Sequence, residues 1–355
     1  MSTPQKLCDD PAQLPPDYPA WKLANPLSAT VPISLVKRFL VGADQEVVER
    51  LAERSGISRA LLHEPGARVT QEQFSTLYRL LANELDDEMP GIFSRPFRSG
   101  TLKYLCLSLL DAPRLEVSMH RFSQFLHLIL DDFKVECERD AALGRVTLVP
   151  TKSGYMTNAL GCELLLKCAH GVASWLIGQK IPLLAIEFSF PKPLYVGDYP
   201  YLFPGPVRFD AEHTCMSFEA TYMDMPIRRH KADLQDFLAR APEDWIFVTF
   251  AEQMMCHRVR HYIAGCLPEV VTIEATAQAL NHSVRTLCRR LTDEGTTFQA
   301  IKNELRRDIA IQRLTRTDDT IAAIADDIGF DDSTAFHRAF RSWTGSTPQA
   351  YRKVQ

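Results

Sequence analysis

The stretch TIEATAQALNHSVRTLCRRLTDEG at residues 272–295 has the same pattern as TIAAIADDIGFDDSTAFHRAFRSWTG at residues 320–345. Both stretches begin with Thr-Ile, and a threonine at that place suits the N-cap of a helix. Apolar residues follow at helical spacing up to a short turn, which is Asn281-His282 or Gly329-Phe330, and a second helical pattern comes after it. This repeat, with a period of about 48–50 residues, predicts two helix-turn-helix units.

The second helix of each unit, beginning at Ser283 or near Asp332, has one apolar face and one polar face. Leucines or phenylalanines four residues apart form the apolar face, which we expect to pack on the first helix. In a helix-turn-helix the second helix can lie in the major groove of DNA, where a bidentate arginine–guanine contact contributes about 1–3 kcal/mol of base discrimination. The polar faces predicted to meet the groove carry Arg285, Thr286, Arg289 and Arg290 in the first unit, and Ser333, Thr334, His337, Arg338 and Arg341 in the second.

The charge of this region does not by itself predict DNA binding, because exposed arginines are common on solvated helix faces. From Glu243 to Gln355 the chain has 14 Lys plus Arg and 15 Asp plus Glu, so the net charge is 14 − 15 = −1. Binding would therefore require basic groups gathered on one face, and it would weaken steeply with salt. The duplication favours DNA binding, because both copies leave basic residues on the same face. The acidic residues Asp326, Asp327, Asp331 and Asp332 are interpreted as a solvated corner, and Asp332 also suits the positive end of a helix dipole.

A helical pattern without Gly or Pro, FQAIKNELRRDIAIQRL at residues 298–314, joins the two units. A rigid helix there would fix the distance between the two reading helices. Two such helices about 34 Å apart would face successive major grooves on one side of the duplex. Arg306 and Arg307 on the joining helix are interpreted as structural or ion-paired residues.

The rest of the chain of 355 residues divides into regions of different pattern. Residues 1–30 are rich in proline and are predicted to form a flexible N-terminal tail. Residues 31–238 show helical patterns and then strand patterns, which predict an α+β domain with a small sheet. A linker is expected at residues 239–246. Residues 247–355 are predicted to be an all-α domain with the two helix-turn-helix units and their joining helix.

The composition, with 46% hydrophobic and 24% charged residues and a formal net charge of −4, is typical of a globular protein. The nine cysteines are scattered without a CxxC pair, which indicates a reduced cytoplasmic protein, and no ligands show zinc-site spacing. The sequence contains no signal-peptide pattern, and its longest apolar stretch is too short to span a bilayer. It contains no HExxH, GxSxG, P-loop or paired-glycine dinucleotide motif. We therefore expect no catalytic residue, no metal, no cofactor and no membrane contact.

The two units, the joining helix and the ending GFDDSTAFHRAFRSWTGSTPQAYR resemble the DNA-binding domain of AraC/XylS-type bacterial transcriptional regulators. The likeness runs from about Phe247 to Arg352, and IADDIGF, FHRAFRSWTG and TPQAYR fall in the order and spacing of that family. Upstream, FLVGADQEVVERLAERSGIS, TQEQFSTLYRLLANELDDEMPGI and LEVSMHRFSQFLHLILDDF are similar to the effector domain of a subgroup, a domain of the arabinose-binding type.

The resemblance implies a sequence-specific regulator that binds double-stranded DNA at a promoter or operator. It also implies that residues 31–238 serve in effector sensing and dimerisation, with a small-molecule effector, a homodimer and contact with RNA polymerase. We expect an activator in the cytoplasm, associated with the nucleoid when it is bound to DNA. The family's base-facing positions correspond to Val284, Arg285, Cys288 and Arg289 in the first reading helix, and to Ser333, Thr334, His337 and Arg338 in the second.

The effector site is predicted from composition alone. Residues 93–133 and 155–175 are rich in Leu, Phe, Met and aromatic residues, and an apolar pocket with a few polar anchors is the usual form of a small-molecule site. A packed core would explain the same composition. Two alternatives to a sensor stay open, namely an enzyme in the N-terminal domain and a protein-interaction module. The candidate anchors for an apolar or amphipathic effector are Arg95, Arg98, Tyr104, His120 and His127.

Overall fold

The computed structural model describes residues 30–40, 43–152, 158–193, 199, 203, 205–247 and 255–352, so the predicted N-terminal tail lies almost wholly outside the described residues. The chain forms two compact units. Unit 1 consists of Met1–Ile33, Ser58–Gln71 and Ala251–Gln355, and unit 2 consists of Ser34–Ile57 and Glu72–Phe250. The domain limits expected from the sequence stay a prediction. The units also interleave in a way that no sequence pattern indicated, because residues 58–71 belong with the C-terminal helices.

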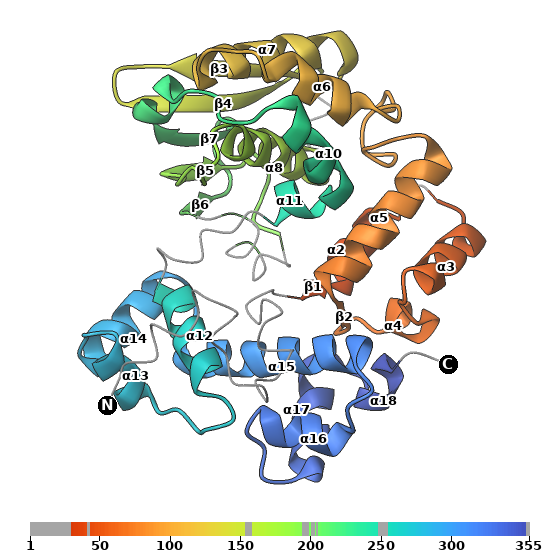
Figure 1. Cartoon of the computed structure of the whole chain (residues 1–355), viewed down its shortest axis with the longest axis vertical. Coiled ribbons are helices and arrows are strands. Elements are labelled where there is room, and N and C mark those ends of the chain that lie inside the picture. Colours follow the sequence, from red (N-terminus) through yellow and green to blue (C-terminus); the bar gives the residue numbers. More distant parts are fainter. Residues whose placement is uncertain are drawn as a thin grey trace. The chain divides into compact units, whose positions relative to one another are not determined.

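Unit 2 contains a five-stranded sheet, which confirms the predicted combination of helices and a small sheet (Figure 1). The strand order is β3-β4-β7-β5-β6, and neighbours are antiparallel except for β5 and β6. Val135, Val146 and Leu148 are buried at alternate positions, because successive residues of a strand point to opposite faces of the sheet. The strands are β3 Phe133–Arg139, β4 Leu143–Pro150, β5 Ala185–Glu187, β6 Val207–Arg208 and β7 Thr214–Glu219.

Helices α7 and α8 pack on this sheet. α7 contacts β3, and α8 contacts β4, β7 and α7. The Asn158 side chain caps α8 by accepting a hydrogen bond from the N–H of Gly161 at 2.9 Å. Gly171 lets α11 approach α8 closely, since a Cβ at this position would lie 2.5 Å from Cβ of Trp245. The helices of unit 2 are α2 Ile33–Arg38, α3 Gln45–Arg54, α5 Gln71–Leu85, α6 Thr101–Leu109, α7 Leu115–Ile129, α8 Ala159–Leu176, the 3₁₀ helix η5 Ala220–Asp224, α10 Lys231–Arg240 and α11 Glu243–Ile246.

Unit 1 is built around the long helix α15, Phe298–Arg316, which joins two groups of shorter helices as predicted (Figure 1). The group α12, α13 and α14 lies toward its N-terminal end, and the group α16, α17 and α18 lies toward its C-terminal end. With 19 residues, α15 is about 28 Å long. The other elements are β1 Val31–Pro32, α4 Arg59–His63, β2 Arg68–Val69, α12 Met255–Cys266, α13 Ile273–Ala279, α14 Val284–Asp293, α16 Ile321–Asp327, α17 Ser333–Thr344 and α18 Pro348–Tyr351.

A segment from the N-terminal half of the chain completes unit 1. We call this segment, residues 58–70, the clasp. Its strand β2 pairs antiparallel with β1, and its helix α4 contacts α18. The backbone N–H of Arg68 donates to Tyr351 Oη at 3.1 Å, and Thr30, just before β1, donates through Oγ1 to Asp308 Oδ1 at 2.6 Å. The clasp and β1 are therefore bonded to α18 and α15.

Candidate DNA-binding surface and effector cavity

The turns inside the two helix-turn-helix units have the same backbone geometry. Asn281 and Gly329 lie 329 − 281 = 48 positions apart, and both have positive φ, 58° and 78°. The next residue donates its backbone N–H to the carbonyl of Ala277 at 2.8 Å in the first unit, and to that of Ala325 at 3.0 Å in the second. A left-handed residue followed by such a bond ends a helix and turns the chain. The sequence repeat is therefore also a repeat in structure.

All four helices of the two units begin at a side chain that accepts a hydrogen bond from the backbone. Thr272 and Thr320 cap α13 and α16 at 3.2 and 3.1 Å, which confirms the prediction. Ser283 caps α14 and Asp332 caps α17, at 3.1 and 2.7 Å from the N–H three residues later. Each cap satisfies a backbone N–H that the helix itself cannot pair. The carboxylate of Asp332 is exposed and caps α17, so it lies at the positive end of the helix dipole, as the sequence indicated.

Buried side chains determine which faces of α14 and α17 are exposed. Leu287 and Leu291 of α14, and Phe336 and Phe340 of α17, are at most 1% exposed. The ring of Phe336 also meets that of Phe330 edge-on, with centroids 5.6 Å apart. Since residues three and four apart share one face of a helix, these contacts leave the opposite face to solvent.

Most of the predicted base-reading residues lie on that opposite face, but Val284 and Ser333, each three residues before a buried side chain, lie toward the packed side. This agreement concerns burial alone, and their contact with DNA stays a prediction. The sequence pattern was sufficient to choose the face, because it depends only on the spacing of the buried residues. Ser283, Arg285, Cys288, Arg289, Ser333, Thr334, His337 and Arg338 are exposed, and Val284 and Thr286 are half-buried.

The arginines of unit 1 include two sets. The members of one set form ion pairs or hydrogen bonds within the protein, and the members of the other form no ion pair with a described residue. Arg260 is buried and donates through Nη2 to Asp308 Oδ2 at 2.8 Å. Arg306 donates to the carbonyl of Gly329 at 2.9 Å, so it has the structural role expected for it. The free set forms no ion pair with any residue in the described ranges, and its charge is available to phosphates and base edges. This set, which we call the reading arginines, comprises Arg285, Arg289, Arg290, Arg338 and Arg341.

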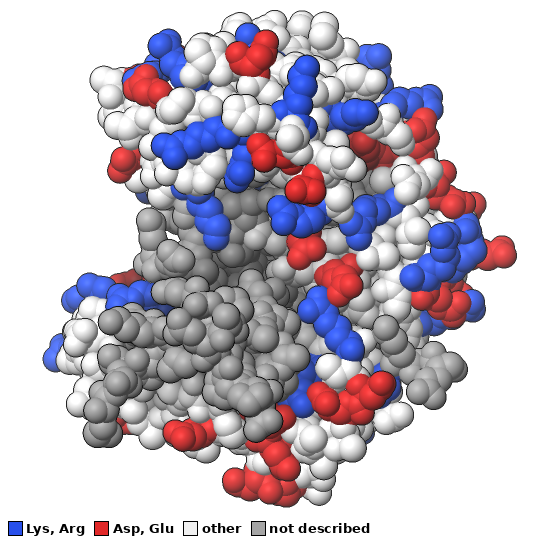
Figure 2. All heavy atoms as spheres, viewed as in Figure 1, with Lys and Arg blue, Asp and Glu red and all other residues white. Residues whose placement is uncertain are grey.

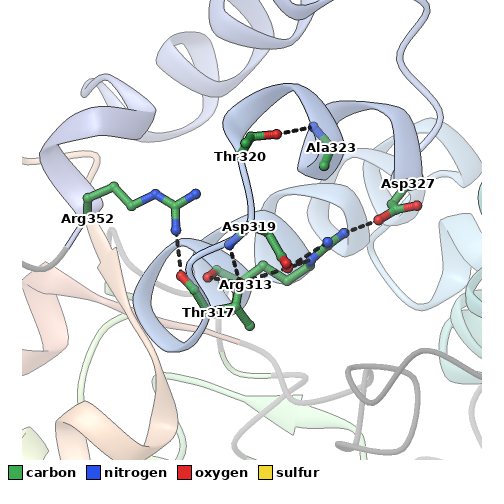
Figure 3. A network of polar contacts seen from close by, with 7 residues as sticks. All are labelled: Arg313, Thr317, Asp319, Thr320, Ala323, Asp327 and Arg352. Carbon is green, nitrogen blue, oxygen red and sulfur yellow. Dashed lines mark hydrogen bonds and ion pairs between the residues drawn. The ribbon is translucent and has the colours of Figure 1, made fainter.

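Figure 3 shows an arginine with a structural role beside the second helix-turn-helix unit. Arg313 of α15 donates to Asp319 Oδ2 at 2.7 Å and to Asp327 Oδ2 of α16 at 2.6 Å. Arg352, which follows α18, donates to the carbonyl of Thr317 at 2.5 Å. These contacts tie α16 and the end of the chain to α15. Asp327 is therefore an ion-pair partner of Arg313, which corrects its interpretation as a simply solvated acid.

On the face of unit 1 that Figure 2 shows, basic and acidic side chains gather in different places. In the view of Figure 2, basic side chains cluster over α14, whereas acidic side chains gather around α16. Such a separation lets a region with a formal charge of −1 present positive charge to the phosphates of DNA on one face.

Unit 2 contains a cavity of about 360 Å³, within the range of small-molecule sites, roughly 300–1,000 Å³. Its wall comes from α5, α6, α7, α8, α10 and α11 and from the segments that connect them. Most of the wall is apolar, and Phe122, Leu126 and Leu165 are among its buried side chains. The cavity is thus a candidate effector site that helices distant in sequence build together. The charged residues of the wall are Arg79, Glu88 and Lys103.

The five predicted effector anchors do not line this cavity. Arg98 instead forms an exposed ion pair with Asp86 at 2.7 Å, and Arg95 donates to the carbonyl of Leu128 at 3.4 Å. Both apolar ranges, 93–133 and 155–175, contribute side chains to the cavity wall, but the polar residues chosen from the first range are exposed to solvent. The anchors therefore stay a prediction that the cavity does not support. Arg95, Arg98, Tyr104, His120 and His127 are all exposed.

Two family models match the chain. Residues 47–227 match the arabinose-binding domain of AraC transcription regulators, N-terminal, and residues 276–354 match a helix-turn-helix domain. The chain belongs to the AraC family of transcriptional regulators. It accordingly combines an N-terminal ligand-binding domain with a helix-turn-helix DNA-binding domain, as the resemblance implied.

Similar proteins include several regulators of this AraC family. The ornithine utilization regulator of Pseudomonas aeruginosa is 28% identical over 64% of this chain and 65% of its own. The transcriptional activator NphR of a Rhodococcus species is 33% identical over 33% of this chain and 37% of its own. The matched region thus spans less than two thirds of either relative. The crystal structure of the transcriptional regulator CdpR from Pseudomonas aeruginosa is 20% identical, with a TM-score of 0.33, over 87% of this chain and 97% of its own.

The described part of this AraC-family chain lacks two kinds of feature. None of its helices is both long and apolar enough to cross a membrane. None of its groups of His, Cys, Asp and Glu is arranged to hold a metal ion. Its cysteines are free thiols, and the one on α14, Cys288, is exposed.

Proposed function

We propose that this protein is a transcriptional activator that binds promoter DNA through α14 and α17 and responds to a small organic effector bound in unit 2. The observation that carries the proposal is the pair of equivalent helices, each with a capped start, a buried face and reading arginines on its exposed face. Activation is supported by NphR, a relative that is named a transcriptional activator. We further propose a homodimer that contacts RNA polymerase and acts on nucleoid DNA in the cytoplasm.

The single joining helix supports simultaneous reading by both units. The two helix-turn-helix units pack at opposite ends of α15, which is about 28 Å long. This helix is therefore suited to hold the two reading helices roughly one helical turn of DNA, about 34 Å, apart. Each helix-turn-helix unit would then place its reading helix in its own stretch of major groove on the same side of the duplex. The operator is therefore expected to contain two half-sites whose centres are about 10 base pairs apart.

The chain also offers a route from the cavity, along α5 and the clasp and through one hydrogen bond, to α18, which contacts the DNA-binding helix α17. α5 lines the cavity with Tyr78 and Arg79, and it begins at Gln71, directly after the clasp. Within the clasp, Arg68 is bonded to Tyr351 of α18. A ligand that favours one arrangement of α5 would therefore favour one arrangement of the clasp. The size of the response is limited by the difference in ligand affinity between the two arrangements.

The test begins with selection of fragments from the host genome by the full-length protein at about 0.15 M salt, near physiological ionic strength. The selected sites are then titrated with wild type, Arg289→Ala and Arg338→Ala. Each substitution should weaken binding by about 1–3 kcal/mol and relax the preference for the base that it contacts. Arg50→Ala is the control, because this exposed arginine belongs to unit 2 and pairs with Glu84.

The spacing of the half-sites provides a second arm of the test. Insertion of about five base pairs would turn one half-site to the opposite side of the duplex, since one helical turn is about 10 base pairs. Affinity should then fall to that of a single half-site. A protein-interaction module would select no motif and would respond to neither arginine substitution. Chemical conversion of a bound effector would instead support an enzyme in the N-terminal domain.

A further inference from the structure

We propose that the cavity of unit 2 binds an amphipathic monoanion, with an apolar body inside and a carboxylate at the mouth between Arg79 and Lys103. This inference rests on the proposed function, in which unit 2 senses a small effector. It adds the place of the site, the charge of the ligand and the residues that recognise it. These three points follow from the charges and the unsatisfied groups of the cavity wall.

The negative group of the wall is already satisfied by the protein. The carboxylate of Glu88 accepts the backbone N–H groups of Gly100 and Leu102 at 2.6 and 2.7 Å, at the start of α6. Burial also raises the pKa of Glu88, which lowers the share of its charged form. Cys168, another wall residue, is a neutral thiol because burial raises its pKa to about 12. Neither group therefore offers a free negative charge to a cationic ligand.

The positive groups of the wall lack a matching acid. Arg79 donates only to neutral oxygens, the carbonyl of Ala239 at 2.8 Å and Oγ1 of Thr76 at 3.4 Å. Lys103 has its Nζ 5.8 Å from the ring centroid of Tyr104. Neither cation forms an ion pair with a residue that the structure describes, and both are exposed residues of the cavity wall, which fits a place for them at its mouth. A carboxylate there would gain two charge-assisted contacts without the cost of full desolvation.

A buried donor of the wall also lacks a partner. Trp245 lines the cavity, is 2% exposed, and has an indole N–H with no hydrogen-bond acceptor among the described residues. A buried donor without a partner is costly, so an acceptor oxygen on the ligand body would be favoured there. The ligand that the wall fits best is therefore an acid with an apolar body that carries a carbonyl or ether oxygen.

A charge series of small probes tests this assignment with the full-length protein. The probes are 4-phenylbutanoate, 4-phenylbutan-1-ol and 4-phenylbutan-1-amine, measured by titration calorimetry at neutral pH. The acid should bind at least about tenfold more tightly than the alcohol, which corresponds to about one charge-assisted hydrogen bond, and the amine should bind worst. Equal binding of all three probes, or binding of none, would overturn the inference.

Substitutions assign the contacts. Lys103→Gln and Arg79→Gln should each weaken 4-phenylbutanoate about tenfold and leave the alcohol unchanged, whereas Lys134→Gln, at an exposed lysine of β3, should change neither probe. The keto acid 4-oxo-4-phenylbutanoate should bind more tightly than 4-phenylbutanoate, and Trp245→Phe should abolish that gain. Unaltered acid binding in both glutamine variants would refute the head-group site. The DNA selection needs none of these probes, so failure of this inference leaves that test intact, and failure of the selection leaves this one measurable.

Discussion

Replacement of Asp308 by asparagine is expected to destabilise unit 1 by about 2–5 kcal/mol. Asp308 of α15 is 1% exposed and accepts from Arg260 at 2.8 Å, from Arg307 at 3.1 Å and from Thr30 at 2.6 Å. Asparagine keeps the size of the side chain and removes its charge. Arg260, which is 2% exposed, would then carry a buried charge without its acid.

The magnitude follows from two considerations. Burial alone would raise the pKa of Asp308, but Arg307, Arg260, Arg68 and the hydrogen bond from Thr30 lower it to about 2, against a usual 3.8. That difference corresponds to roughly 2 kcal/mol of stability. Removal of one partner of a buried ion pair costs about 3–5 kcal/mol. The first value is the lower limit, because a protonated aspartic acid keeps two oxygens that can accept, whereas asparagine replaces one of them with an NH2 group that only donates.

The pH dependence has a definite sign. Since the pKa of Asp308 is lower in the folded protein than in the unfolded chain, its contribution is complete above about pH 5 and is lost as the pH falls from about 4 to 2. The difference in stability between wild type and Asp308→Asn should therefore shrink across that range. Asp318→Asn, which removes an exposed acid of the same unit, should behave like the wild type at every pH.

Hydrogen exchange of the α15 amides, followed by mass spectrometry of the full-length protein, measures unit 1 separately from unit 2. At pH 7 the amides that exchange through unfolding of unit 1 should exchange at least about 30-fold faster in Asp308→Asn, as expected for 2 kcal/mol. The pair Arg260→Met with Asp308→Leu should recover much of the loss, because apolar packing can replace a buried ion pair. Protection of α15 within about 0.5 kcal/mol of the wild type in Asp308→Asn would refute the reasoning.

Three further substitutions have distinct expected outcomes. Phe340→Ala should cost unit 1 about 3–5 kcal/mol in chemical denaturation, because this ring is fully buried, and near-normal stability would contradict its place in the core. Asp332→Asn keeps an N-cap acceptor but removes the charge, so it should raise DNA affinity at low salt. Asp332→Ala removes the cap as well and should also lower the stability of the fold by about 1 kcal/mol in thermal unfolding. Equal DNA titrations for Asp332→Asn and the wild type would show that this charge is remote from DNA. Tyr351→Phe removes the hydroxyl that accepts the hydrogen bond from Arg68 of the clasp. It should therefore reduce the change in DNA affinity that an effector causes, while DNA binding without effector persists. An unchanged response to effector would exclude a route through the clasp and α18.

The helix-turn-helix units could be predicted from the sequence because local groups determine them. Thr272 and Thr320 cap helices through bonds to residues three positions away. The turn depends on one left-handed residue, Asn281 or Gly329, and asparagine and glycine tolerate this conformation best. Because these signals recur after 48 residues, each copy supports the interpretation of the other.

The effector cavity and the clasp could not be predicted because distant parts of the chain build them. The hydrogen bond from Arg68 to Tyr351 spans 283 positions, and no spacing rule relates such residues. The cavity wall joins Tyr78 of α5 with Leu165 of α8 and Trp245 of α11. An abundance of Leu and Phe in a helix indicates burial, but it does not say which polar neighbours face inward. That information requires the packing of α5, α6 and α11 around the cavity.

The difference between composition and the packing of individual side chains also explains how a C-terminal region with a net charge of −1 can suit DNA. A formal count gives every acid equal weight, but several acids of unit 1 are engaged by the protein. Asp308 and Asp327 pair with structural arginines, Glu294 accepts the N–H groups of Met255 and Cys256 at 2.7 Å, and Asp332 caps α17. The reading arginines have no such partners in the described chain. Their charge is consequently free to act on phosphates within the Debye length, about 8 Å at physiological salt, so the position of the reading arginines matters more than the net count.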